Sequence, residues 1–255
     1  MQNSLTWSPD QPLHLLAIDT STSTLSLGVA LWAAHSTTPR LFLHQGAGAA
    51  QSSGSMIPAI QELLAQAGLS LSDLHAIVFG AGPGSFTGLR TACAVAQGLA
   101  LSANLPVLPV NTLMAVAQDW HTHHQTLKED SVVWSLIDAR MQEMYAGSWR
   151  LRHFQGWPSW HEEHPACLVA PNHLEALPEL QQASCRAGNV TAEYGDVLPW
   201  SVDPAMPTAA AMLQLAPALL LQGQAIDPAL ALPYYVRNKV AQTTAERAAA
   251  ATARA

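Results

Sequence analysis

The sequence predicts an α/β fold of the ribonuclease-H-like kind, because three early strands in hairpin order are followed by alternating helices and strands. This order (strand, strand, strand, helix, strand, helix, strand) fills the first 111 residues. The chain has 255 residues, of which 49% are hydrophobic, so it can bury the core of one large domain or of two lobes. An ordinary doubly wound sheet is the alternative arrangement.

Apolar runs mark the first three strands. Residues 13–19 (LHLLAID) end in Asp19, which four hydroxyl residues follow, and predict a buried strand that enters a polar turn. Residues 24–32 alternate apolar side chains on one face, as strands do. Residues 40–45 predict the third strand.

The next elements alternate between helix and strand. Apolar side chains recur at helical spacing over residues 56–67, and Gly68 is suited to cap this helix. Residues 75–80 (HAIVFG) predict a short buried strand. Residues 88–103 predict a second helix, and residues 105–110 predict the strand that follows it.

The second half of the chain has a weaker pattern. Residues 132–140 and 143–152 predict two strands that start a second, degenerate copy of the lobe. The prolines and tryptophans between residues 152 and 207 predict irregular structure there.

These elements divide the chain into two lobes and a tail. We assign residues 1–111 to an N-terminal ribonuclease-H-like lobe, which is completed by a helix near residues 208–223 with a kink at Pro217. Residues 112–207 are assigned to a smaller, degenerate second lobe. Residues 241–255 are a low-complexity, alanine-rich tail to which we assign no function.

The chain is poor in charge. Charged residues make up 11% of it, the net charge is −7, and Lys128 and Lys239 are its two lysines. Because nucleic-acid backbones are bound through Lys and Arg, this composition argues against a chain that binds tRNA unaided. A partner that covers part of the apolar surface is consistent with so few charges.

Cysteine use and the N-terminus indicate a compartment. Cys93, Cys167 and Cys185 are an odd number without close spacing, so we expect neither a disulfide framework nor a metal knuckle. The first residues do not resemble a signal peptide, and no apolar run approaches the roughly 18 residues needed to span a bilayer. We therefore expect a cytoplasmic protein that does not associate with membranes.

The glycine-rich stretch at residues 80–90 (GAGPGSFTGLR) fits neither nucleotide-binding template. No lysine lies near it, as a phosphate loop requires, and the dinucleotide motif would need glycine at Ser85 or Thr87. Because glycines let backbones approach closely, a structural turn is the favoured interpretation. The alternative is a nucleotide or anion site at the start of the following helix, composed of Asp19, Gly82, Gly84, Ser85, Thr87 and Gly88.

Small side chains form two rows on the helix predicted at residues 88–103. Ala92, Ala96, Ala100 and Ala103 lie in one row, and Thr91, Ala94, Val95 and Gly98 lie in the other. Two small faces predict two close neighbours, namely the chain's own sheet and a second protein, whereas a tightly buried core helix is the alternative. We predict that the row of Ala92 and Ala96 faces the partner.

Metal and catalytic motifs are absent from the sequence. No two of the 11 histidines stand at the i, i+4 spacing that puts two imidazoles on one helix face. Asp19 at a strand end is similar to the first phosphate motif of actin-like ATPases, although the glycine of Asp-x-Gly-Thr is missing. We expect no metal, no cofactor and no catalytic residue.

Four motifs, in this order and at these separations, resemble the bacterial TsaB family: LLAIDTST, GAGPGSFTGLR, LIDARMQEMY and YYVR. They extend from residue 15 to residue 237, and the glycine motif is the specific one. The resemblance implies an actin-like ATPase fold that has lost much of its catalytic apparatus, with two lobes of mixed sheets flanked by helices and a reduced second lobe. The chain departs from the family at Ser52, where members carry histidine.

The resemblance also implies a function and partners. A TsaB protein is the non-catalytic subunit of the complex that makes threonylcarbamoyladenosine in tRNA. It pairs with the catalytic subunit TsaD, the pair binds the ATPase TsaE, and tRNA is bound only by the complex. A homodimer in the absence of TsaD is compatible with the same surface.

We expect the partner to contact the helices near residues 55–67 and 88–103. The predicted contact residues are Met56, Ile60, Leu63, Leu64, Arg90, Ala92, Ala96 and Ala100. A self-contained ATPase or kinase-like enzyme, which would use Asp19 and the loop from Gly82 to Gly88, is the alternative function.

Overall fold

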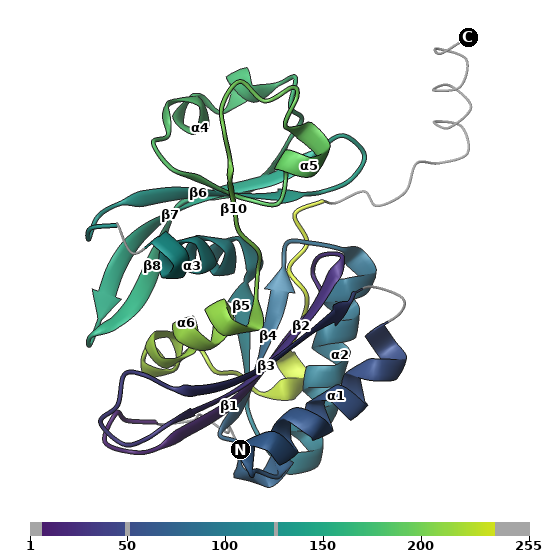
Figure 1. The fold of residues 1–255 in the computed structure, drawn as a ribbon, viewed down its shortest axis with the longest axis vertical. Helices are drawn as coiled ribbons and strands as arrows, with labels where there is room; N and C mark the ends of the chain where they lie inside the picture. The colour runs from purple at the N-terminus through teal and green to yellow at the C-terminus, as the bar shows by residue number, and fades with distance from the viewer. Residues whose placement is uncertain (1–6, 49–51, 125–126, 238–255) are drawn as a thin grey trace.

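The chain folds around two five-stranded sheets (Figure 1). The computed structural model describes residues 7–48, 52–124 and 127–237. The first sheet has the order β3-β2-β1-β4-β5 and the second has the order β10-β9-β6-β7-β8. The strands of the first sheet are β1 (Leu13–Asp19), β2 (Thr24–Trp32), β3 (Arg40–Ala47), β4 (Ala76–Gly82) and β5 (Val107–Asn111).

Helices cover both faces of the first sheet. Side chains alternate along β1, so Leu16 and Ile18 pack in one core cluster while Leu15 and Ala17 pack in another. The first cluster lies under α1 (Ser52–Ala67) and α2 (Phe86–Ala103). The second lies under α6 (Ala209–Leu221) and α3 (Thr112–His124).

The second sheet repeats the pairing of the first. In each sheet, three strands pair antiparallel in chain order and a parallel pair extends the first of them. The repeat is reduced, because its last two strands are very short. The strands are β6 (Val132–Asp138), β7 (Met144–Phe154), β8 (Trp157–Val169), β9 (Arg186–Gly188) and β10 (Asp203–Pro204).

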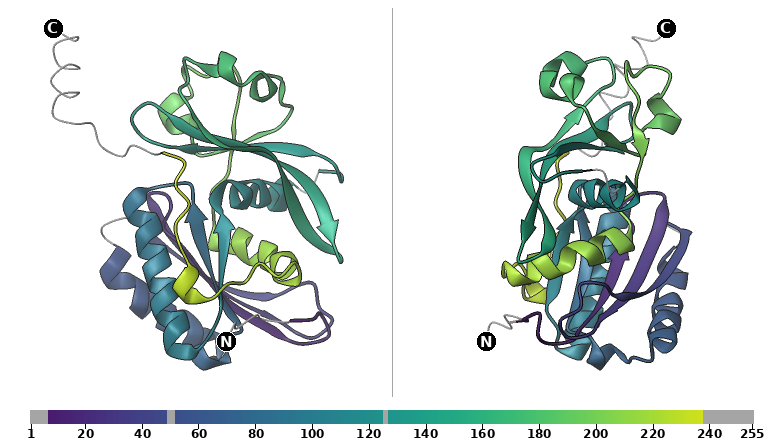
Figure 2. Two further views of the ribbon diagram at one scale, coloured as in Figure 1. Left: turned by 180° about the vertical axis from the view of Figure 1, so that it is seen from behind. Right: turned by 60° about the vertical axis from the view of Figure 1, so that its left-hand side comes forward.

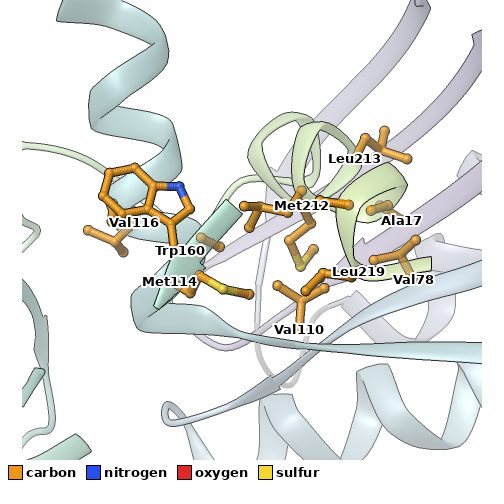
Figure 3. Close-up of a cluster of buried hydrophobic side chains, with 14 of the residues drawn as sticks. Ala17, Val78, Val110, Met114, Val116, Trp160, Met212, Leu213 and Leu219 are labelled. Atoms are coloured by element: carbon orange, nitrogen blue, oxygen red, sulfur yellow. The ribbon is translucent and has the colours of Figure 1, made fainter. Parts of the chain in front are cut away.

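This repeated order confirms the predicted fold class, an actin-like, ribonuclease-H-like α/β fold with two mixed sheets. The two sheets share one core, in which α3 and α6 pack together between them (Figures 2 and 3). Met114 of α3 and Met212 of α6 belong to this core, as does Trp160 of β8.

The outer face of the second sheet is covered by short elements. Trp134 and Leu136 of β6 pack there with Leu180 and Tyr194. The elements are α4 (Pro178–Gln182), α5 (Thr191–Tyr194) and the 3-10 turn η3 (Leu174–Ala176); two further turns, η2 (Leu71–Asp73) and η4 (Pro228–Leu230), belong to the first lobe.

The prediction of irregular structure from residue 152 onward is wrong for the first part of that range. β7 and β8 form a long hairpin whose turn, Gln155–Gly156, has φ values of 50° and 86°. Such positive φ values suit a tight hairpin turn. Pro158 lacks an N–H group, but β8 is an edge strand, where proline is tolerated.

None of the helices within residues 7–48, 52–124 and 127–237 has the length and apolarity needed to cross a membrane. The alanine-rich tail at residues 241–255 lies outside the described residues.

Candidate functional site

A cleft with a volume of ≈ 770 Å³ opens where the first lobe, the second lobe and the C-terminal segment meet. The first lobe contributes the turn after β1 and the glycine-rich loop. The second lobe contributes the end of β6 and residues near α5. The residues that carry polar or aromatic groups into the cleft include Ser21, Thr22, Ser85, Thr87, Asp138, Arg140, Asn189, Glu193, Tyr234, Tyr235 and Arg237.

The glycine-rich loop packs directly on the backbone that follows β1. A Cβ atom at Gly88 would lie 1.7 Å from the carbonyl oxygen of Thr20, so no larger residue fits there. The Thr20 hydroxyl donates to the Gly88 carbonyl oxygen over 2.7 Å, and the Ser85 N–H donates to the Ser21 carbonyl oxygen over 2.7 Å. Gly82 has a φ of 118°, which side chains rarely permit. Close backbone packing therefore accounts for these glycines.

Asp19 is enclosed behind this loop. Its side chain is 1% exposed, and its Oδ1 accepts hydrogen bonds from the Ser21 N–H and hydroxyl. Its Oδ2 faces Gly80, where an added Cβ would lie 1.9 Å away, and has no hydrogen-bond partner among the described residues. Burial raises the pKa of this carboxyl to about 7, against the opposing effect of the Ser21 hydrogen bonds.

The structure divides the six residues predicted for a nucleotide or anion site. Gly84, Ser85 and Thr87 line the cleft, whereas Asp19, Gly82 and Gly88 do not. The Ser85 hydroxyl caps α2 by accepting from the Gly88 N–H over 3.4 Å.

The second lobe supplies cleft residues that the predicted site did not include. Asp138 ends β6, as Asp19 ends β1, and accepts from the Tyr194 hydroxyl over 3.0 Å and the Arg140 N–H over 2.8 Å. Arg140 also pairs with Asp138 through its guanidinium at 3.2 Å. Burial, together with the hydrogen bond to Asp138, raises the pKa of Tyr194 to about 12. A carboxylate at a strand end is the sequence signal that identifies Asp138.

The C-terminal segment joins the two lobes across the cleft. The Tyr234 N–H donates to the Ala81 carbonyl oxygen of β4 over 2.7 Å. Three residues later, the guanidinium of Arg237 forms an ion pair with Glu143 of the second lobe. The YYVR motif therefore connects the end of one sheet to the other.

A second candidate site is an apolar groove between α1 and α2, with a volume of ≈ 300 Å³. Ile57 stands exposed at its rim, and Ile60 and Leu64 form its floor. Leu99 of α2 and Leu71 of η2 also line it.

The predicted orientation of α2 is wrong. Ala92, Ala96 and Ala100 are completely buried in the chain's own core, where they pack against side chains of the first sheet. Their row is the one that lets α2 approach the sheet closely. The opposite side of the helix is exposed at Arg90, at the small residues Ala94 and Gly98, and at Leu101, which is 61% exposed.

The predicted contact residues of α1 are also mainly core residues. Met56, Ile60, Leu63 and Leu64 are each less than a tenth exposed, because α1 turns these side chains toward the sheet. Arg90 is the predicted contact residue that remains exposed. Its guanidinium lies 3.7 Å from the centre of the Phe86 ring, and its Nε donates to the Tyr235 hydroxyl over 3.0 Å.

Within the part of the chain that the structure describes, no group of three or more His, Cys, Asp or Glu residues is arranged to hold a metal ion. His123 and His124, at the end of α3, instead contact the carbonyl oxygens of Asp119 and Trp120 through Nδ1.

Comparisons with known proteins find similarity through most of the chain. The family model for TsaD, tRNA N6-adenosine threonylcarbamoyltransferase, matches residues 47–159. The tRNA threonylcarbamoyladenosine biosynthesis protein TsaB of Haemophilus influenzae is 36% identical over 238 residues, which cover 90% of this chain and 96% of that protein. The TsaB protein of Escherichia coli is 34% identical with the same coverage. The solved structure of YeaZ from Pseudomonas aeruginosa is 32% identical, with a TM-score of 0.71 over 88% of this chain and 99% of that one.

Proposed function

The chain belongs to the TsaB family, and from this premise we propose that it is a non-catalytic subunit of a tRNA-modifying complex. The complex installs the threonylcarbamoyl group on N6 of adenosine 37 in tRNAs that read codons starting with A. In it, the chain binds and activates the catalytic subunit TsaD and, together with TsaD, recruits the ATPase TsaE. The chain contacts tRNA only as part of this complex.

The observation that carries this proposal is the exposed face of α1 and α2. The groove between the helices is apolar, and Ile57 is 37% exposed at its rim. Beside it, Ala94 and Gly98 leave the middle of the outer side of α2 without bulky side chains, and Leu101, which is 61% exposed, adds apolar surface toward its C-terminal end. Small residues let a second helix approach closely, and an apolar groove gains free energy when a partner covers it. A protein with helices to pack against these two is the expected partner.

The environment of Asp19 and the glycine-rich loop supports a non-catalytic role. An actin-like ATPase needs a carboxylate that reaches the nucleotide and its metal, whereas Asp19 is enclosed with a raised pKa. The loop glycines are used for contacts with Thr20 and the backbone after β1, and the loop has no lysine.

Reconstitution tests the proposed function. Purified TsaD and TsaE from the same source are supplied with tRNA, ATP and a threonylcarbamoyl donor, with and without the chain, and modified adenosine is measured by mass spectrometry. We expect modification only when the chain is present, and none from the chain alone. Equal modification without the chain contradicts the proposal, as does failure of the chain and TsaD to co-elute in size-exclusion chromatography.

The cleft between the lobes favours a second candidate function, that of a self-contained ATPase or kinase-like enzyme. Its size, ≈ 770 Å³, suits a nucleotide, and Ser85 and Thr87 face it. ATP turnover by the purified chain distinguishes the two functions. Turnover that Asp19→Ala abolishes favours the enzyme, whereas no turnover leaves the accessory role as the better account.

A further inference from the structure

A second exposed apolar surface lies beside α2, along the contacts of Cys93 and Gln97 with the C-terminal segment. We use the name strap for residues 226–237, which cross the first lobe after α6. Leu230 is 68% exposed and Leu232 is 75% exposed, and Tyr234 and Tyr235 are exposed as well. These four side chains fall within six residues, so the strap concentrates apolar surface rather than scattering it.

The strap is held firmly in place. The side-chain amide of Gln97, on α2, donates to the carbonyl oxygens of Pro228 and Ala231 over 2.8 and 3.2 Å. At its two ends, Ile226 pairs with Val107 of β5, and the Tyr234 N–H bonds to β4. Buried Ala231 anchors the segment, so Leu232 is presented outward from a fixed backbone. Such preorganised side chains lose little conformational freedom when a partner binds.

The strap and α1 lie on opposite sides of α2. Leu99 of α2 lines the groove with α1, whereas Cys93 and Gln97 contact the strap. Figure 2 (left) shows the yellow segment running beside α2. Near the N-terminal end of α2, the Arg90 guanidinium donates a hydrogen bond to the Tyr235 hydroxyl and so connects the helix surface to the strap. The three elements therefore form one layer, with the small residues Ala94 and Gly98 along its middle.

We propose that the strap is the third element of the surface that docks TsaD, and that Leu230 and Leu232 hold the docked helices from the side opposite the α1 groove. This inference rests on the proposed function. Residues 228–236 of the strap carry no charged side chain, so the strap fits an apolar protein surface. Arg90, together with the tyrosines, adds residue types that dominate binding energy at protein interfaces.

The comparison with TsaD favours that partner over a second copy of the chain. The TsaD model matches residues 47–159, a range that contains α1 and α2 but not the strap. Because both families share these helices, the helices alone cannot determine whether the chain pairs with TsaD or with a second copy of itself. The strap lies outside the matched range, so we expect its contact to differ between the two chains, and such differences produce specificity.

The test measures TsaD affinity for single aspartate variants of the full chain by isothermal titration calorimetry. Leu230→Asp and Leu232→Asp change exposed side chains, and circular dichroism checks that the variants remain folded. We expect each variant to weaken TsaD binding about tenfold or more, because it places an unpaired charge in an apolar contact that the partner desolvates. Leu43→Asp is the matched control, because Leu43 is 52% exposed on β3, beside Leu213 on the α6 side of the sheet.

The outcomes separate the two proposals. If both strap variants bind TsaD like the unmodified chain while Ile57→Asp binds weakly, the strap proposal is wrong and the proposed function stands. If the strap variants impair only self-association, the occupant is a second copy and the strap proposal is again wrong. If the unmodified chain does not bind TsaD at all, both proposals fail.

Discussion

Asp19 shows how one buried carboxyl affects the stability of the protein. Its pKa rises from 3.8 to about 7 because the folded chain removes it from water. Between these values the folded chain holds a proton that the unfolded chain has released. The contribution of Asp19 to stability is therefore largest below about pH 4 and is lost as the pH rises toward 7.

We predict that Asp19→Asn removes this part of the pH dependence. The variant keeps an acceptor for the Ser21 hydrogen bonds but cannot ionise. The free energy of unfolding of the original chain, relative to the variant, is expected to fall by roughly 1.4 kcal/mol per pH unit between pH 5 and 7. Urea unfolding at several pH values measures it. Parallel curves for the two proteins would show that Asp19 ionises normally.

Among the elements, α2 has two faces with opposite requirements. Ala96 is fully buried against the first sheet, and Ala94 is exposed on the side that we assign to the partner. A tryptophan at position 96 has no space in a close-packed core, whereas at position 94 it extends into solvent.

We therefore predict different defects for Ala96→Trp and Ala94→Trp. The first is expected to lower the free energy of unfolding by about 3 kcal/mol or to prevent folding, as severe overpacking does. The second is expected to fold normally and to lose TsaD binding. Circular dichroism during thermal unfolding and a pull-down with TsaD distinguish them. A folded Ala94→Trp variant with unchanged binding would remove this side of α2 from the docking surface.

At the scale of the whole molecule, Arg237 connects the lobes. Its ion pair with Glu143 joins the strap to the second lobe, and the Arg237 side chain is only 14% exposed. Partial burial makes this pair less screened by solvent than a surface pair. Arg237 also lines the cleft between the lobes, so a single substitution removes a contact that joins the lobes beside it.

We predict that Arg237→Ala loosens the lobes without unfolding either of them. Loss of the pair is expected to cost about 1 kcal/mol and to lower the melting temperature by a few degrees. Hydrogen exchange should increase at the cleft residues near Asp138 and Tyr234. Arg152→Ala is the matched control, since its pair with Asp130 is more exposed, at 39% and 59%. Equal changes in both variants would exclude a specific role for Arg237.

Only part of the candidate site could be predicted from the sequence, because only part of it depends on residues that are adjacent in the chain. Gly84, Ser85 and Thr87 line the cleft. They could be predicted because a glycine-rich turn after a strand is recognised from adjacent residues. The enclosure of Asp19 depends on Gly80, which is 61 residues away in the chain, and was not predictable from the neighbours of Asp19. Arg237 could not be assigned to the site because its partner Glu143 comes from the other lobe, whereas Asp138 carries the same strand-end signal as Asp19 and was overlooked.

The sequence by itself determined the order of strands and helices in the first lobe and the family to which the chain belongs. Apolar spacing and turn residues act over a few positions, so they can be recognised without the fold. Only the tertiary structure decided which row of α2 meets the sheet, since both rows consist of small residues and burial depends on distant partners. It also decided that Trp157 and Trp160 belong to a strand, because the core that they fill is built by α3, α6 and the first sheet.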